Sequence, residues 1–176
     1  VIGSSTGGTN ALEKLIPFMP PNFPPVLVVQ HMPPKFTQNF AQRLNQISQV
    51  NVKEAEDGDK ILTGTVYIAP GDFHMELKTK TSLVVHQGER VNRHRPSADP
   101  LFESAARFWG KDAVGVILTG MGNDGALGMQ TLKMAGAYNI AQDEESCVVF
   151  GMPKEAIKLG VVDAVLPLSD IFQHLA

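Results

Sequence analysis

Residues 25–47 read PVLVVQHMPPKFTQNFAQRLNQI, and the predicted fold follows from the order of elements within them. The apolar run Pro25–Gln30 is typical of a strand that is buried on both faces of a parallel sheet. After Pro33 and Pro34, apolar side chains recur at helical spacing over Phe36–Ile47. A buried strand followed by an amphipathic helix predicts an α/β fold, because helices of this kind connect neighbouring parallel strands.

Strands and helices alternate in the same way along the rest of the chain. Further strands are expected at Val1–Gly3, Asn51–Ala55, Thr65–Ala69, Ala113–Leu118, Tyr138–Gln142 and Asp163–Leu166. Further helices are expected at Gly7–Phe18, at Ser97–Trp109, at Ala126–Met134, after Pro153 and from Asp170 onward. The runs Met75–Thr79 and Leu83–His86 predict an antiparallel hairpin, placed as an edge or a flap of the mostly parallel sheet.

The size and composition indicate one globular domain spanning residues 1–176. The net charge of -3 gives no sign of a nucleic-acid partner, and no apolar run approaches the roughly 20 residues needed for membrane insertion. Cys147 is the single cysteine, so an internal disulfide and a cysteine-based zinc site are excluded. A reducing compartment, the cytoplasm, is therefore expected. Because the chain begins inside a strand, we also expect it to be a domain cut from a longer polypeptide.

Polar loops follow three of the predicted strands. They comprise Gly3–Gly8, Gln30–Pro33 and Thr119–Gly125. In an open parallel sheet, ligands bind beyond the carboxyl ends of the strands, so these loops are expected to share one rim. The rim would carry a hydroxyl, an imidazole and a carboxylate, from Ser5, His31 and Asp124.

The glycine-rich loop Gly3–Gly8 is compatible with three roles. A strand-to-helix turn can present Ser5 as a nucleophile and the amide of Thr6 to an oxyanion. The same turn suits a phosphate, although the loop lacks the spacing of the usual dinucleotide and P-loop motifs. In the simplest alternative its hydroxyls only cap the following helix.

His31 and Asp124 also have structural alternatives. The Met32-Pro33 sequence restricts the loop after His31, which favours a fixed imidazole that accepts the Ser5 proton. His31 is otherwise an ordinary strand-end histidine, and Asp124 is otherwise a turn aspartate among glycines. The residues alone therefore leave a Ser-His-Asp hydrolase and a phosphate-binding module both open.

Five ordered motifs resemble those of the CheB-type protein-glutamate methylesterases of bacterial chemotaxis. They are Ile2–Gly8 (IGSSTGG), Gln30–Pro33 (QHMP), Tyr67–Gly71 (YIAPG), Arg93–Ser97 (RHRPS) and Leu118–Gly125 (LTGMGNDG). The resemblance covers essentially the whole chain as the catalytic domain of the family, without the family's N-terminal receiver domain. It implies a three-layer α/β/α fold with a doubly wound, mostly parallel sheet and a small antiparallel hairpin.

The resemblance assigns roles to five positions of this sequence. Ser5 corresponds to the nucleophile, His31 to the general base and Asp124 to the carboxylate that orients the base. Thr6 and Met121 correspond to positions that build the oxyanion site. One departure concerns the residue before the nucleophile: Ser4 stands where the family often has alanine, so a second hydroxyl lies beside Ser5.

The implied reaction is hydrolysis of glutamate methyl esters on the cytoplasmic helices of methyl-accepting chemotaxis receptors, with release of methanol. Deamidation of receptor glutamines is compatible with the same chemistry, and no metal or cofactor is required. The implied partners are these receptors and the receiver domain of the full-length protein. The alternatives are a serine esterase or amidase for small molecules, and a phosphate- or nucleotide-binding module.

A basic cluster between residues 90 and 95 is the expected docking element for acidic receptor helices. It consists of Arg90, Arg93, His94 and Arg95. Within it, Arg93 and Arg95 are the predicted substrate-binding residues. A solvated loop is the alternative interpretation of the same charges.

Overall fold

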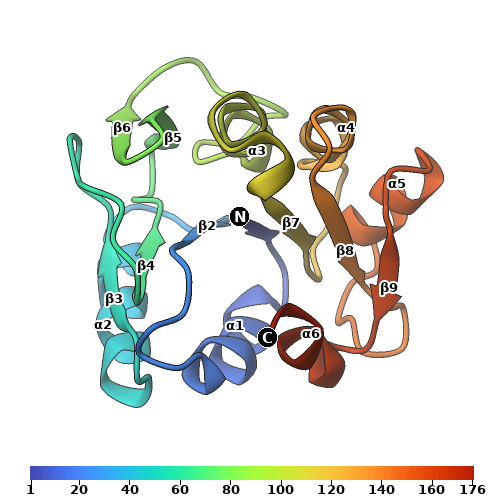
Figure 1. Cartoon of the computed structure of the whole chain (residues 1–176), viewed down its shortest axis with the longest axis horizontal. Helices are drawn as coiled ribbons and strands as arrows, with labels where there is room; N and C mark the ends of the chain where they lie inside the picture. Colours follow the sequence, from blue (N-terminus) through green and yellow to red (C-terminus); the bar gives the residue numbers. More distant parts are fainter.

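The computed structural model describes residues 1–176 and contains a seven-stranded parallel sheet. The strand order is β3-β4-β2-β1-β7-β8-β9 (Figure 1). The strands are β1 (Ile2–Ser4), β2 (Val26–Gln30), β3 (Asn51–Glu54), β4 (Thr65–Ile68), β7 (Val114–Ile117), β8 (Tyr138–Gln142) and β9 (Ala164–Leu166). After β1 the chain adds β2, β3 and β4 on one side of β1, and then returns to add β7, β8 and β9 on the other side. The topological switch point therefore lies between β1 and β7.

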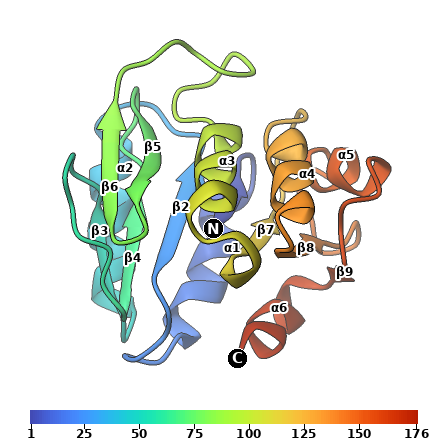
Figure 2. The same cartoon turned by 45° about the horizontal axis from the view of Figure 1, so that its top comes forward.

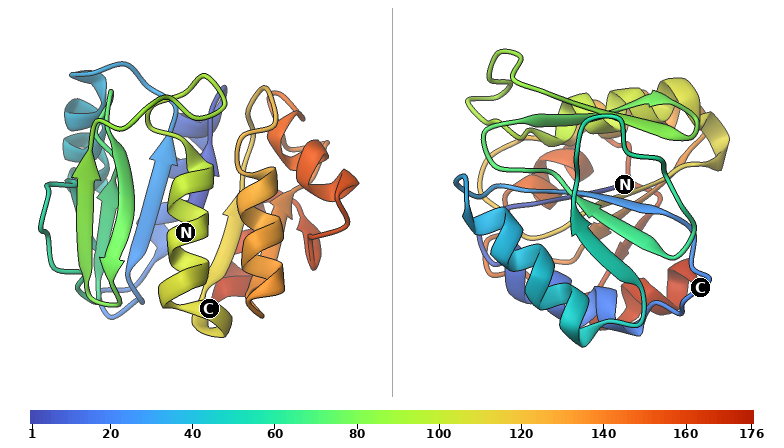
Figure 3. Two further views of the ribbon diagram at one scale, coloured as in Figure 1. Left: turned by 90° about the horizontal axis from the view of Figure 1, so that it is seen from above. Right: turned by 90° about the vertical axis from the view of Figure 1, so that its left-hand side faces the viewer.

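Six α-helices cover the two faces of the sheet. They are α1 (Gly8–Leu15), α2 (Phe36–Ile47), α3 (Ala98–Phe108), α4 (Ala126–Met134), α5 (Met152–Lys158) and α6 (Leu168–Leu175). Helices α1, α2 and α6 lie on one face, and α3 and α4 lie on the other, which gives three layers (Figures 1 and 3). Short 3-10 turns, η1 (Ile16–Phe18) and η2 (Gly110–Asp112), follow α1 and α3.

Two apolar cores fill the spaces between these layers. Alternate residues of β2 enter opposite cores: Leu27 and Val29 pack toward α3, while Val26 and Val28 pack toward α1 and α2. This alternation explains why the strand is apolar at every position.

The predicted hairpin forms a separate two-stranded sheet of β5 (His74–Thr79) and β6 (Ser82–His86). It is not an edge of the main sheet but packs on α3, beside the other elements of that layer (Figure 3). The buried side chains of Met75, Leu77 and Leu83 join the core under α3. The amide of Leu77 donates to the Ser104 hydroxyl of α3 at 2.9 Å, which fixes the hairpin on the helix.

The predicted α/β class, the parallel sheet and the antiparallel hairpin are confirmed. Predicted and observed ends differ mainly at the first and last helices. The α-helical part of the first ends at Leu15 rather than Phe18, because the segment that contains Pro17 forms the 3-10 turn η1. The last begins at Leu168 rather than Asp170, with Pro167 at its N-cap position. No helix has the length and apolar character needed to cross a membrane.

Candidate active site

The loops that follow β1, β2 and β7 lie side by side at the carboxyl edge of the sheet. Ser4 pairs with Gln30 in the parallel register, and the amide of His31 donates to the carbonyl of Ser4 at 3.1 Å. On the other side, the amide of Ser5 donates to the carbonyl of Thr119 at 2.9 Å. One ladder of backbone hydrogen bonds therefore sets the relative positions of the three loops.

The two neighbouring serines occupy different environments. Ser4 is fully buried, with 0% of its surface exposed, and its hydroxyl donates to Oε1 of Gln30 at 2.5 Å. Ser5 is partly exposed and lines a depression of about 530 Å³. The other residues that line this depression are Asn92, Arg93, His94, Met121, Gly122 and Asn123. Of the two serines, only Ser5 is accessible to a substrate in this depression.

Glycines allow the loops to approach Ser5 closely. Gly7 precedes α1 with a φ of 83°, in the left-handed region that favours glycine. A Cβ atom at Gly120 would lie 2.7 Å from the Cβ of Ser5 and 2.4 Å from the sulfur of Met152. A side chain at position 120 would therefore displace both Ser5 and Met152.

His31 and Asp124 form a buried pair at the same edge. Nε2 of His31 lies 2.6 Å from Oδ2 of Asp124, and the side chains are 9% and 1% exposed. The other ring nitrogen of His31, Nδ1, is buried and has no hydrogen-bond partner. No hydrogen bond therefore joins the Ser5 hydroxyl to Nδ1, and this nitrogen is free to accept a proton.

The carboxylate of Asp124 lies at the N-terminus of α3. It accepts hydrogen bonds from the hydroxyl of Ser97 at 2.6 Å and from the amide of Ala98 at 2.8 Å. Burial by itself raises the pKa of Asp124, but the hydrogen bonds from His31, Ser97 and Ala98 outweigh it and lower the pKa to about 2. Asp124 is therefore ionised at neutral pH and can hold the imidazole of His31 in one orientation.

Two free amides lie beside Ser5. The N–H groups of Thr6 and Met121 donate to no acceptor within the protein. The hydroxyl of Thr119 donates to the carbonyl of Thr6 at 2.9 Å, which ties the first loop to the third. Met121, 69% exposed, belongs to the third loop and lines the depression with Ser5. Unpaired N–H groups in such a place are suited to an oxyanion.

His94 stacks on His31, a contact that the sequence does not predict. The two ring centroids lie 3.7 Å apart and the planes differ by 11°. Burial, and then the proximity of His31, lower the pKa of His94, which favours a neutral ring above His31. The available sequence signal was the position of His94 four residues before α3, whose N-terminus lies at this edge of the sheet.

The structure separates the two predicted substrate-binding arginines. Arg93 lines the same depression as Ser5, and its side chain forms no ion pair. Arg95 donates to the carboxylate of Asp72 at 2.6 and 3.1 Å and to the carbonyl of Gly88 at 3.0 Å. Hydrogen bonding to Arg95 lowers the pKa of Asp72 despite its partial desolvation. Arg95 lines a neighbouring depression of about 360 Å³, and its guanidinium is engaged by the turn between β4 and β5 through Asp72 and by its own loop through Gly88.

The model of the family described as CheB methylesterase matches residues 1–175. The chain belongs to the CheB methylesterase family. It is 55% identical over 177 residues to a protein from Yersinia pestis named protein-glutamate methylesterase/protein-glutamine glutaminase. The identity is also 55% over 177 residues to a protein of the same name from Salmonella typhimurium. Each alignment covers 99% of this chain and 51% of the relative, so the chain spans about half the length of the curated relatives it matches.

A solved CheB structure has the same fold. It is the catalytic domain of the CheB methylesterase from Thermotoga maritima, which is 48% identical to this chain with a TM-score of 0.96. The match covers 99% of this chain and 94% of the solved chain. The three-layer arrangement described above is therefore that of a CheB catalytic domain.

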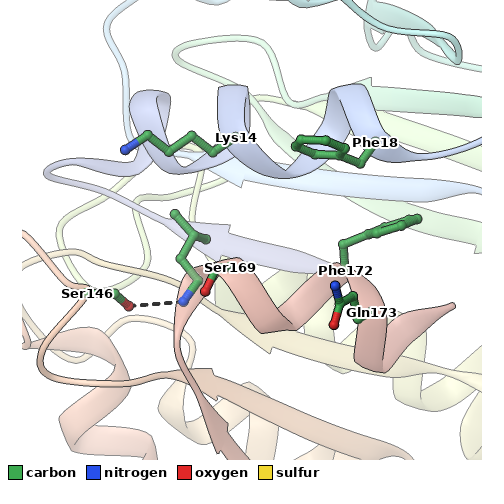
Figure 4. Close-up of a pocket in the computed structure, with 7 residues that line it drawn as sticks. Lys14, Phe18, Ser146, Ser169, Phe172 and Gln173 are labelled. Atoms are coloured by element: carbon green, nitrogen blue, oxygen red, sulfur yellow. Dashed lines mark hydrogen bonds between the residues drawn. The ribbon is translucent and has the colours of Figure 1, made fainter.

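A second cavity of this CheB domain, of about 600 Å³, lies between α1 and α6 (Figure 4). It is lined by Lys14, Phe18, Ser146, Leu168, Ser169, Phe172 and Gln173. The amide of Leu168 donates to the Ser146 hydroxyl at 3.1 Å (Figure 4). This cavity is lined by no imidazole or carboxylate, unlike the edge formed by the three loops. Nowhere in the chain does a group of three or more His, Cys, Asp or Glu side chains form a candidate metal site.

Proposed function

We propose that this domain is a serine hydrolase that removes methyl esters from glutamate side chains of chemoreceptors. Membership of the CheB family supports the proposal, as do relatives named protein-glutamate methylesterase/protein-glutamine glutaminase. The observation that carries it is the buried pair of His31 and Asp124, 2.6 Å apart, beside the accessible Ser5. In this proposal residues 1–176 form one catalytic domain.

The reaction begins when Ser5 attacks the ester carbonyl carbon. Its hydroxyl proton passes to Nδ1 of His31, the ring nitrogen without a partner in the structure. Asp124, hydrogen-bonded to Nε2, stabilises the imidazolium that forms. A hydrogen bond between Ser5 and Nδ1 is required for this transfer, and such bonds commonly tighten only when substrate is bound.

The tetrahedral intermediate places a negative charge on the former carbonyl oxygen. The free amides of Thr6 and Met121 are the proposed donors to this oxyanion. Collapse of the intermediate expels methoxide, which leaves as methanol after taking the proton from His31. Water, deprotonated by His31, then hydrolyses the acyl-Ser5 ester and restores the glutamate.

Deamidation of receptor glutamine is a second proposed activity of the same site. It is the same acyl transfer, with ammonia as the leaving group instead of methanol. The names of the relatives include protein-glutamine glutaminase, which favours this activity. Release of ammonia from a receptor with unmodified glutamines tests it separately from release of methanol.

Receptor helices and a receiver domain are the proposed partners. Arg93 at the depression can pair with acidic groups that flank the methylated residue, because no carboxylate of the protein engages it. The relatives are about twice as long as this chain, which leaves room for a regulatory receiver domain. We place the full-length protein in the cytoplasm with the methylated receptor helices.

The deciding experiment measures methanol release from membranes that contain methylated receptors. Wild-type protein should release methanol, whereas Ser5→Ala, His31→Ala and Asp124→Asn should be strongly impaired. Ser4→Ala is the matched control, because Ser4 is buried while Ser5 is accessible. Loss of activity in Ser4→Ala with full activity in Ser5→Ala would show that the nucleophile is misassigned.

A small-molecule esterase or amidase is the competing function. Hydrolysis of generic methyl esters at a rate equal to or above that on receptors would favour it. A phosphate-binding module would instead resist labelling by a serine-directed phosphonate and retain ligand binding in Ser5→Ala.

A further inference from the structure

Helices α3 and α4 exchange their N-terminal caps. Asp124 lies just before α4, yet its carboxylate accepts hydrogen bonds from Ser97, Ala98 and the amide of Asp99, at the start of α3. Asp99 lies in the first turn of α3, yet its Oδ1 accepts from the amide of Gly128 in α4, at 2.7 Å. The two helices lie side by side with their first turns at the same level (Figure 2). Each carboxylate therefore satisfies N–H groups of the other helix.

Asn92 joins the two carboxylates directly. Its Nδ2 donates to Oδ2 of Asp99 at 2.6 Å and to Oδ1 of Asp124 at 2.9 Å. A primary amide has two N–H groups on one nitrogen, and these two bonds use both of them. The backbone of Asn92 has a φ of 53°, in the left-handed region that asparagine adopts more readily than most residues. Both the donor pair and the backbone conformation thus suit asparagine at this position.

This network determines which oxygen of Asp124 faces His31. Oδ1 of Asp124 accepts from Ser97, from Asn92 and, at 3.3 Å, from the amide of Asp99. Oδ2 is shared by His31 and the amide of Ala98. With Oδ1 held by donors from two segments, rotation of the carboxylate away from His31 would break several hydrogen bonds.

The neutral amide of Asn92 also separates two buried acids. Burial raises the pKa of Asp99, and the nearby charge of Asp124 acts in the same direction, against the hydrogen bonds from Gly128 and Asn92. Without a donor between them, the two carboxylates would repel each other at close range. Asn92 therefore holds Oδ1 of Asp124 in place, and Asp99 fixes the amide group of Asn92 that does so.

We propose that Asn92 and Asp99 are positioning residues for the hydrolytic reaction, which act by locking the carboxylate of Asp124 toward His31. The inference rests on the role of Asp124 in the proposed function. Neither residue supplies a reacting atom. Their effect is to keep Nε2 of His31 bonded to Asp124, so that Nδ1 remains the ring nitrogen that accepts a proton.

The test compares Asn92→Ala and Asp99→Asn with the wild type on methylated receptors and on a small methyl ester. An asparagine at position 99 offers a single carbonyl oxygen, so either Gly128 or Asn92 loses its acceptor. Glu103→Gln is the matched control, because it neutralises another carboxylate of α3 that forms no hydrogen bond in this network. Thermal unfolding of each variant sets an assay temperature at which all of them are folded.

Both variants are expected to lower kcat roughly 10- to 100-fold on either substrate while KM stays unchanged. The downfield proton resonance of the His31 N–H bonded to Asp124 should weaken or disappear in both variants and persist in Glu103→Gln. If Asp99→Asn does not fold, Asn92→Ala decides alone, because Asn92 belongs to an exposed loop and its removal leaves both helix caps in place.

Two results would overturn the inference while leaving the proposed function intact. In the first, Asp124→Asn is inactive but Asn92→Ala and Asp99→Asn behave like Glu103→Gln. In the second, Asn92→Ala raises KM with kcat and the His31 resonance unchanged, which would make Asn92 a substrate-binding residue. Full activity of Asp124→Asn would instead refute the proposed role of Asp124 and remove the basis of the inference.

Discussion

Replacement of Asp124 with asparagine is expected to remove a pH-dependent part of the stability of this domain. Burial alone would raise the pKa of Asp124, but hydrogen bonds from His31, Ser97 and Ala98 lower it from 3.8 to about 2. Because each pKa unit corresponds to about 1.4 kcal/mol, this difference stabilises the folded wild type by about 2 kcal/mol at neutral pH.

The sign of the effect follows from the lowered pKa. A carboxylate that is more acidic in the folded state stabilises the fold fully above its unfolded pKa. That contribution to the unfolding free energy is lost as the pH falls through the pKa of the folded state. For Asp124 the loss is therefore expected between about pH 4 and about pH 2. Asparagine cannot titrate, so the variant lacks this component at every pH.

Urea unfolding at several pH values from about 6 to about 2 measures the free energy of unfolding and tests the prediction. The difference in unfolding free energy between wild type and Asp124→Asn should be constant near neutral pH and shrink by about 2 kcal/mol toward pH 2. Glu145→Gln, which changes an exposed carboxylate in the loop after β8, should follow the wild type throughout. A difference between wild type and Asp124→Asn that does not change with pH would refute the role assigned to the hydrogen bonds.

Three further predictions concern the loops around the site. Ser4→Ala removes a buried hydroxyl that is hydrogen-bonded to Gln30, so it should lower the unfolding free energy by about 1 kcal/mol. Its esterase activity should stay intact, and an inactive but fully stable Ser4→Ala variant would contradict this. Gly120→Ala places a methyl group 2.7 Å from the Cβ of Ser5, so it should abolish most activity and lower Tm. A wild-type rate would show that the loop tolerates a side chain at this position. Arg93→Ala should raise KM for receptors but not for a small ester. Arg95→Ala should mainly lower Tm, because that guanidinium is bonded to Asp72 and Gly88 and ties two segments of the protein together. Equal kinetic effects of both changes would argue against separate roles.

Much of the fold could be predicted from local sequence. Apolar runs such as Val26–Gln30 are bounded by prolines and polar loops, and α2 and α4 were expected with the ends that the structure shows. The position of the hairpin could not be predicted, because its alternating pattern shows that one face is buried but not which element covers it. In the structure that element is α3, through Leu77 and Ser104.

The candidate site could be predicted only in part from the sequence. The sequence placed Ser5, His31 and Asp124 after three strands, and parallel strands bring their carboxyl ends to one edge. The roles of these residues in catalysis stay predictions. His94 was missed as a neighbour of His31, because stacking across a loop and a strand end leaves no periodic signal.

The sequence by itself determined the order of strands and helices and the residue types available at the carboxyl edge of the sheet. These features depend on periodicity and on glycine and proline, which act over a few neighbouring residues. Only the tertiary structure decided that Ser4 is buried while Ser5 is accessible, and that Arg95 is engaged by Asp72. It also decided that Asp124 caps α3 rather than its own helix. The physical reason is that burial and hydrogen-bond partners are set by contacts between segments far apart in the chain, such as His31 and Asp124, which are separated by 93 positions.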